Sequence, residues 1–253
     1  MIENEISSRL PVEGSEIAVR TLPGRAPGVM WLGGFKSDMT GTKAEHLARW
    51  AAARGTAYVR FDYSGHGASG GRFEDGTISR WLAESLAVFD RATAGPQVLV
   101  GSSMGGWMAL LLARALASRG EKRLAALVLI APAPDFTEAL MWERFPPPVR
   151  QLIETSGRFL KPSLYGEDPY VITRDLIEDG RRHLLLGAPF AVGCPVRILQ
   201  GAADEDVPWE HAMRLVSCLA EDDVVFSLVK DGDHRLSRPE DLERLIAALE
   251  EFV

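Results

Sequence analysis

The sequence predicts an α/β fold built on a mostly parallel sheet, and two recurring patterns support this. Short apolar runs recur along the chain, and several show no alternation, as strands buried on both faces of a parallel sheet should. Between them, apolar residues repeat at three- and four-residue spacing, which is typical of helices with one face on a core. The alternation of the two patterns favours right-handed crossovers within one sheet.

Each predicted element can be placed along the chain. Strands are expected at residues 29–32, 58–61, 98–100, 127–130, 196–199 and 224–229. One helix has its inward face at Ile78, Trp81, Leu82, Ser85 and Phe89. Others run from Met104 to about Ser118, from Pro208 and from near Pro239, and proline at the last two starts suits the first helical turn.

Composition and charge narrow the class of protein. The 253 residues suit one large domain, or a domain with an insertion. A balance of 28 Lys and Arg against 35 Asp and Glu gives a net charge of −7 without any basic run, which argues against a nucleic-acid partner. Cys194 and Cys218 match neither a disulfide framework nor a zinc spacing. Both are expected to be small buried hydrophobes, and no metal site is predicted.

Residues 1–11 are acidic and lack the apolar stretch of a secretory signal. The longest apolar runs, such as residues 104–113, are far shorter than the roughly 20 residues that cross a bilayer. We therefore expect a cytoplasmic protein without stable membrane insertion. The sequence leaves its oligomeric state open.

The stretch from 135 to 194 breaks the alternation. It holds Phe-Pro-Pro-Pro at 145–148, several helical patterns and no convincing buried strand. We interpret it as a helical lid inserted between two parts of the core, residues 1–134 and 195–253. Its apolar residues, which either line a pocket or pack the insertion onto the core, include Phe136, Leu140, Met141, Trp142, Phe145, Leu152, Ile153, Phe159, Leu160, Leu164 and Tyr165.

The sharpest signal for chemistry is Gly-Ser-Ser-Met-Gly-Gly at residues 101–106, between a predicted strand and a predicted helix. A strand that turns sharply into a helix forces its central residue into a strained conformation, and the flanking glycines leave room for it. Ser103 stands at that centre, so it is predicted to be an exposed nucleophile. Ser102 is interpreted as a turn residue.

A serine hydroxyl needs a base and a group that orients the base. His234 follows the predicted strand 224–229, and Asp204 follows the strand before it, so the chain order is serine, acid, histidine. Asp135, in the loop after strand 127–130, is the competing acid.

Position selects His234 from the five histidines. His46 and His211 lie in helical patterns and are expected on solvated faces. His183 lies in the insertion, without a second ligand at metal spacing. His66 occupies a Gly-His-Gly turn that precedes the serine, so it is interpreted as structural.

The oxyanion of a tetrahedral intermediate needs two backbone donors. One is expected from Met104, the residue after the nucleophile. The other is expected from Phe35, because the preceding Gly33 and Gly34 let the loop after strand 29–32 approach closely.

These motifs resemble the α/β-hydrolase superfamily. Longer stretches resemble one branch, the mitochondrial palmitoyl-protein thioesterases and acyl-glucuronide esterases with their bacterial relatives; they are residues 34–44, 60–65, 95–107, 194–197, 207–209 and 233–235. The resemblance implies a triad of Ser103, Asp204 and His234 and an esterase or thioesterase activity without a cofactor. Three departures stand out: His66 replaces a smaller residue, nothing in the sequence resembles a mitochondrial presequence, and the insertion matches least.

The expected reaction is a two-step acyl transfer from a small-molecule or acylated substrate. The apolar insertion favours a fatty acyl group, whereas its arginines (144, 150, 158, 181 and 182) would suit an acidic one. Two alternatives stay open. One is another α/β-hydrolase reaction, such as carbon–carbon or peptide cleavage, and the other is a non-catalytic binding protein on the same scaffold.

Overall fold

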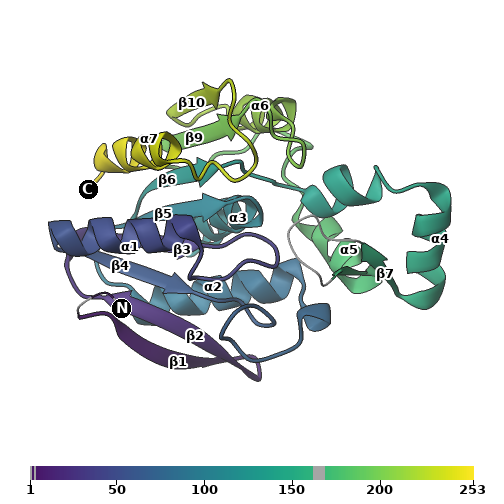
Figure 1. The fold of residues 1–253 in the computed structure, drawn as a ribbon, viewed down its shortest axis with the longest axis horizontal. Helices are drawn as coiled ribbons and strands as arrows, with labels where there is room; N and C mark the ends of the chain where they lie inside the picture. Colours follow the sequence, from purple (N-terminus) through teal and green to yellow (C-terminus); the bar gives the residue numbers. More distant parts are fainter. Residues whose placement is uncertain (1, 3, 162–168) are drawn as a thin grey trace.

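A computed structural model of the chain describes residues 2, 4–161 and 169–253. Its centre is an eight-stranded sheet in the order β1-β2-β4-β3-β5-β6-β9-β10 (Figure 1). The strands are β1 (Ile6–Val12), β2 (Ser15–Leu22), β3 (Arg25–Leu32), β4 (Thr56–Phe61), β5 (Gln97–Ser102), β6 (Leu124–Ile130), β9 (Val196–Gly201) and β10 (Val224–Val229). All pairs from β4 to β10 are parallel, so the predicted fold class is confirmed.

The sequence did not predict β1 and β2. They form an antiparallel hairpin that joins the sheet where β2 pairs with β4. Most of β1 is exposed, and Ile6 retains 55% of its accessible surface. The largely exposed β1 lacks an apolar run such as those that marked the six predicted strands.

Five helices cover the two faces of the sheet: α1 (Thr42–Arg54), α2 (Ile78–Ala92), α3 (Met104–Ser118), α6 (Trp209–Cys218) and α7 (Pro239–Glu250). Alternate residues of β3 show why both faces need cover. Met30 and Leu32 pack in the core that holds α2 and α3, whereas Val29 and Trp31 pack in the core that holds α1 and α7. Pro239 opens α7 as predicted, but Pro208 precedes α6 instead of lying in its first turn.

Residues 131–195 connect β6 to β9, and none of those described joins the central sheet. They form a π-helix (Phe136–Trp142), α4 (Pro147–Ser156), β7 (Arg158–Lys161), β8 (Tyr170–Thr173), α5 (Arg174–Gly180) and a 3₁₀ turn (Arg181–His183). Figure 1 shows α4, α5 and β7 set apart from the sheet, at the end toward which β5 and β6 point.

The insertion is less helical than predicted, because β7 and β8 pair as a separate antiparallel sheet. Each has only four residues, and β7 is largely exposed, so neither leaves a buried run in the sequence. Leu164 and Tyr165, two of the apolar residues assigned to the insertion, lie outside the described residues.

Two smaller expectations can be compared with the structure. Cys194 is buried as predicted, but Cys218 is only half-buried at the end of α6, and both thiols are free. Across the described ranges, no helix has the length and apolar character that crossing a membrane requires.

Candidate active site

Ser103 lies at the turn between β5 and α3, with φ of 55° and ψ of −118°. A non-glycine residue pays for this conformation, so the strain predicted from the sequence is present. Gly105 explains how the turn closes, since a Cβ there would lie 2.0 Å from the Leu32 carbonyl oxygen. The turn leaves Ser103 partly exposed, while Ser102 and Met104 on either side are buried.

The structure brings Ser103, His234 and Asp204 into one hydrogen-bonded chain. The His234 Nε2 atom lies 3.1 Å from Ser103 Oγ, and His234 Nδ1 lies 2.8 Å from Asp204 Oδ2. With Nδ1–H donating to the carboxylate, Nε2 is the acceptor that faces the serine hydroxyl. This is the order in which a base and its orienting acid activate a serine.

Asp204 is held by several donors besides the histidine. Its Oδ1 atom accepts the N–H of Asp206 at 3.0 Å and of Val207 at 2.8 Å. Its Oδ2 atom accepts from the buried Gln200 amide at 3.2 Å. The side chain of Asp204 is fully buried, so these bonds determine its orientation.

The competing acid, Asp135, is used elsewhere. Its carboxylate accepts the N–H groups of Leu185 and Leu186, both at 2.8 Å. Burial raises the pKa of Asp135, and the two N–H donors oppose that rise. Asp135 therefore links the start of the insertion to its end. Its role is structural, whereas Asp204 is the acid that contacts His234.

The loop after β3 lies beside the nucleophile. A Cβ on Gly34 would be 3.5 Å from the Ser103 Cβ. The next residue, Phe35, has an N–H group that meets no acceptor among the described residues. Met104 opens α3, so its N–H is one of the donors that a helix leaves unpaired at its start. Both predicted oxyanion donors thus belong to segments that flank Ser103.

His66 has a contact that the sequence did not reveal. Its Nε2 atom accepts the N–H of Lys36 at 3.1 Å, and its Nδ1–H donates to the Ser64 carbonyl at 3.1 Å. Burial lowers the pKa of His66 to about 4, which keeps the ring neutral and Nε2 free to accept. His66 is structural, as predicted, but what it supports is the residue after Phe35, where φ is 56°. Nothing in the Gly-His-Gly sequence predicts a hydrogen bond between His66 and the Lys36 N–H.

The Phe35 side chain joins the loop to the insertion. Its ring lies 5.5 Å from Phe136 and 5.9 Å from Tyr170, both in the insertion, and 4.9 Å from Phe73 in the core. Lys36 adds a hydrogen bond of 3.0 Å from Nζ to the Pro169 carbonyl. Residues on both sides of the predicted boundary at 134/135 therefore pack around one aromatic ring.

The other histidines have structural partners. His211 Nε2 lies 2.7 Å from the Pro134 carbonyl oxygen, so the expectation of a solvated face was wrong for this residue. His183 Nε2 lies 2.7 Å from Ser79 Oγ, between α2 and the insertion. His46 is half-buried on α1.

One cluster in the described part of the chain has the spacing of a metal site, with Asp204, Asp206 and His234 offering ligand atoms within 4.8 Å of one another. Both ring nitrogens of His234 already face partners, Asp204 on one side and Ser103 on the other. The geometry therefore favours proton transfer over metal binding at this position.

Comparison with known proteins bears on the family of this chain. Residues 29–179 match a family model described as serine aminopeptidase, S33. The mitochondrial palmitoyl-protein thioesterase ABHD10 of Mus musculus is 36% identical over 238 residues, which are 94% of this chain and 78% of that protein. The chain belongs to the α/β-hydrolase family. The Homo sapiens protein of the same name is 35% identical over the same share of this chain and 76% of its own length.

Solved structures extend the likeness over the whole fold. A putative hydrolase from Agrobacterium vitis S4 superposes with a TM-score of 0.92 at 46% identity, covering 98% of this chain and 97% of that one. The α/β-hydrolase domain-containing protein 10 from mouse gives 0.86 at 34% identity, with 97% of each chain covered. The family predicted from the sequence is confirmed, and a serine hydrolase of ester or thioester bonds is supported.

These relatives overturn one prediction. The ABHD10 proteins are named as mitochondrial, which contradicts the cytoplasmic location expected for this chain. That expectation rested on the composition of residues 1–11 and on the shortness of the apolar runs. The compartment of a protein depends on targeting signals that neither its fold nor its site requires, so such composition is a poor guide.

Proposed function

We propose that this α/β-hydrolase cleaves ester or thioester bonds of fatty acyl groups through an acyl-serine intermediate. The observation that carries the proposal is the chain of hydrogen bonds from Asp204 through His234 to Ser103, beside two backbone N–H groups without acceptors. The thioesterase activity in the names of the ABHD10 relatives supports the substrate class.

In the first step, His234 Nε2 takes the proton of Ser103 while Oγ attacks the acyl carbonyl carbon. The carbonyl oxygen gains a negative charge, which the N–H groups of Phe35 and Met104 stabilise. Asp204 stabilises the imidazolium through Nδ1. When the tetrahedral intermediate collapses, His234 returns the proton to the leaving alcohol or thiol, and the acyl group stays on Ser103.

In the second step, water takes the place of the leaving group. His234 removes a proton from the water as its oxygen attacks the acyl-serine carbonyl, and the same two donors stabilise the second oxyanion. Collapse releases a carboxylic acid and restores the serine hydroxyl with the proton from His234. The nucleophile, the base and the donors all come from this chain.

We further propose that residues 135–194 act as a lid over the acyl group. Support comes from the insertion's Phe136 and Tyr170, which pack against Phe35 beside the proposed oxyanion donors. Four of the five arginines considered earlier already have partners. Arg150 bonds to backbone carbonyls, while Arg158, Arg181 and Arg182 pair with Glu74, Glu138 and Asp179. These pairings favour an apolar acyl group over an acidic one.

The test uses purified protein with p-nitrophenyl esters and acyl thioesters of graded chain length. Ser103→Ala is expected to lower kcat on the order of 10⁶-fold. Ser102→Ala, which removes the neighbouring buried hydroxyl, is the matched control and should stay within about tenfold of wild type. A fluorophosphonate should label the wild-type protein and Ser102→Ala, but not Ser103→Ala.

The alternatives predict other outcomes in the same assay. Preferential cleavage of aminoacyl p-nitroanilides would indicate a peptidase. Labelling of Ser103 without turnover of any acyl substrate would point to another reaction of the family. Absence of both labelling and turnover would leave a binding protein and reject the enzyme.

A further inference from the structure

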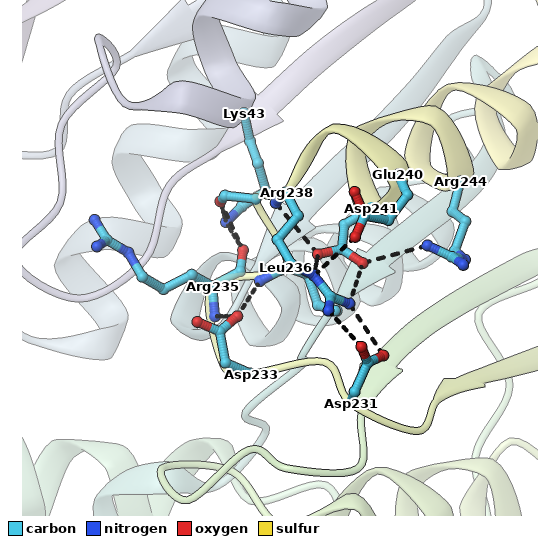
Figure 2. Close-up of polar contacts among 10 residues, drawn as sticks. Lys43, Asp231, Asp233, Arg235, Leu236, Arg238, Glu240, Asp241 and Arg244 are labelled. Carbon is cyan, nitrogen blue, oxygen red and sulfur yellow. Dashed lines mark hydrogen bonds and ion pairs between the residues drawn. The ribbon is translucent and has the colours of Figure 1, made fainter.

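The loop that carries His234 joins β10 to α7 and is stabilised from within (Figure 2). The Asp233 carboxylate accepts the N–H of Arg235 at 3.1 Å and of Leu236 at 3.0 Å. Leu236 has a φ of 42° and a buried side chain, so the loop turns at a strained and well-packed residue. His234 thus lies between Asp233 and Arg235, which are linked by the Asp233 carboxylate.

Helix α7 closes the far end of the loop. Arg238 bonds to Asp231 at 2.7 Å and to Asp241 at 2.8 Å, and Arg244 approaches the same Asp241 at 3.4 Å. The Asp241 side chain is fully buried, and these cations lower its pKa. Figure 2 shows Arg238 between the two carboxylates, bridging the start of the loop and the first turn of the helix.

Lys43 contacts this loop from a different element, helix α1. It lies in the first turn of α1, and its Nζ donates to the Arg235 carbonyl and to Ser237 Oγ, the latter at 3.3 Å. Arg235 follows His234 directly. Helix α1 follows the loop that carries Phe35, so Lys43 connects the helix after one of the two proposed active-site loops to the other loop.

We propose that Lys43 is a positioning residue: it holds the Arg235 peptide and thereby keeps the His234 ring in line with Ser103. The proposal rests on the proposed function, because it gives Lys43 a role only where His234 acts as the base. Proton transfer needs donor and acceptor within about 3 Å, and a displacement of about 1 Å can cost on the order of 100-fold in rate.

The surroundings of Lys43 make this contact sensitive to pH. Burial lowers the pKa of its ammonium to about 8, and the Arg235 guanidinium adds to the shift. Asp233 in the loop and Asp241 on α7 act in the opposite direction. The ammonium is therefore charged below about pH 8, where it donates strongly, and loses its proton above, where the contact weakens.

The experiment compares Lys43→Met, Lys43→Arg and Lys230→Met by their profiles of kcat against pH, from about pH 6 to about pH 9. Lys230 is an exposed lysine at the start of the same loop, so its replacement controls for the lost charge. Wild type and Lys230→Met should lose activity above about pH 8. Lys43→Met should show about tenfold lower kcat with unchanged KM and no alkaline fall, because the titrating group is gone.

Lys43→Arg should restore most of the kcat and keep it at alkaline pH, since a guanidinium stays charged. Should Lys43→Met fail to fold, this variant decides, and a wild-type alkaline fall in Lys43→Arg would overturn the proposal. Wild-type kcat and profile in Lys43→Met would overturn it as well. Failure of the proposed function looks different, because wild type itself would then show no Ser103-dependent turnover.

Discussion

The two loops that carry the proposed chemistry are stabilised by different physical means. Around Phe35, the loop of residues 33–40 is held by neutral, buried groups, with the His66 ring against the Lys36 N–H and the Phe35 ring among aromatic neighbours. The loop of residues 231–238 is held by charged groups, and one of its ion pairs lies at the surface, where the Arg238 side chain is 35% exposed and that of Asp231 78%.

The difference matches what each loop has to do. Oxyanion donors are effective only when they are already in place before charge develops, so a packed and non-titrating setting suits the residues around Phe35. The histidine gains and loses a proton in each step, and a polar setting stabilises both of its states. We infer that the first loop resists changes of salt and alkaline pH, whereas the second responds to both.

The largest expected effect comes from replacing Asp204, the acid that orients His234. Asp204→Asn should lower kcat on the order of 10⁴-fold, because an amide donates to Nδ1 and favours the tautomer that cannot accept from Ser103. Glu205→Gln, which removes the exposed acid next to it, is the control and should behave as wild type. Circular dichroism should show both variants folded. Activity in Asp204→Asn within tenfold of wild type would move the orienting role to another acid.

The second prediction concerns the stability of the protein at acid pH, which depends on the buried His66 ring. The pKa of His66 lies at about 4 in the folded protein, against 6.5 for an unperturbed histidine. The unfolded chain therefore binds a proton that the native state excludes, and stability falls as the pH drops from about 6.5 to about 4. This group alone should account for about 3 kcal/mol of that loss.

The measurement is urea unfolding of wild type and His66→Phe across that pH range. The phenyl ring keeps the packing against Tyr63, Phe73 and Trp81 but cannot bind the proton. The difference in unfolding free energy between the two proteins should shrink toward acid pH, since only wild type suffers the loss. A difference that stays constant from neutral to about pH 4 would contradict the assignment of a buried neutral ring.

The same variant tests the link from His66 to the oxyanion loop, with a smaller effect. Without an acceptor for the Lys36 N–H, the neighbouring Phe35 N–H loses part of its alignment, and kcat should fall about 10- to 100-fold with KM little changed. His46→Phe repeats the replacement on α1, away from this loop, and should leave kcat unaltered. A His66→Phe enzyme with wild-type kcat would reduce His66 to a packing residue.

Sequence reasoning went furthest where structure is local or follows from strand order. Ser103 is marked by its glycines, and Asp204 and His234 follow adjacent parallel strands, so their convergence could be predicted. The supports of the two loops could not. Lys36 and His66 are 30 residues apart, and Lys43 and Arg235 are 192 apart. Single hydrogen bonds between distant segments depend on side-chain packing, which leaves no periodic pattern.

The fold shows the same division. Strands buried on both faces left continuous apolar runs, whereas the β1–β2 hairpin and the β7–β8 pair, both partly exposed, did not. The insertion was located by the absence of such runs. Its internal pairing depends on contacts between β7 and β8, and each of these strands is too short to be recognised from the sequence. The parallel part of the sheet was therefore predictable, and the region proposed to select the substrate was not.

The smallest expected effect concerns the ion pair of Arg238 and Asp231, which stabilises the loop that carries His234. Arg238 and Asp231 form a partly exposed pair, so salt screens them, and wild-type kcat should fall about two- to threefold between about 0.05 M and about 1 M salt. Asp231→Asn, which leaves Arg238 paired with the buried Asp241, should start at the lower value and show little further dependence on salt. His66→Phe, whose defect lies in the neutral loop, should keep the wild-type salt response. If the salt response of His66→Phe vanished as well, the two loops would not be stabilised independently. The contrast between neutral and charged stabilisation would then not hold.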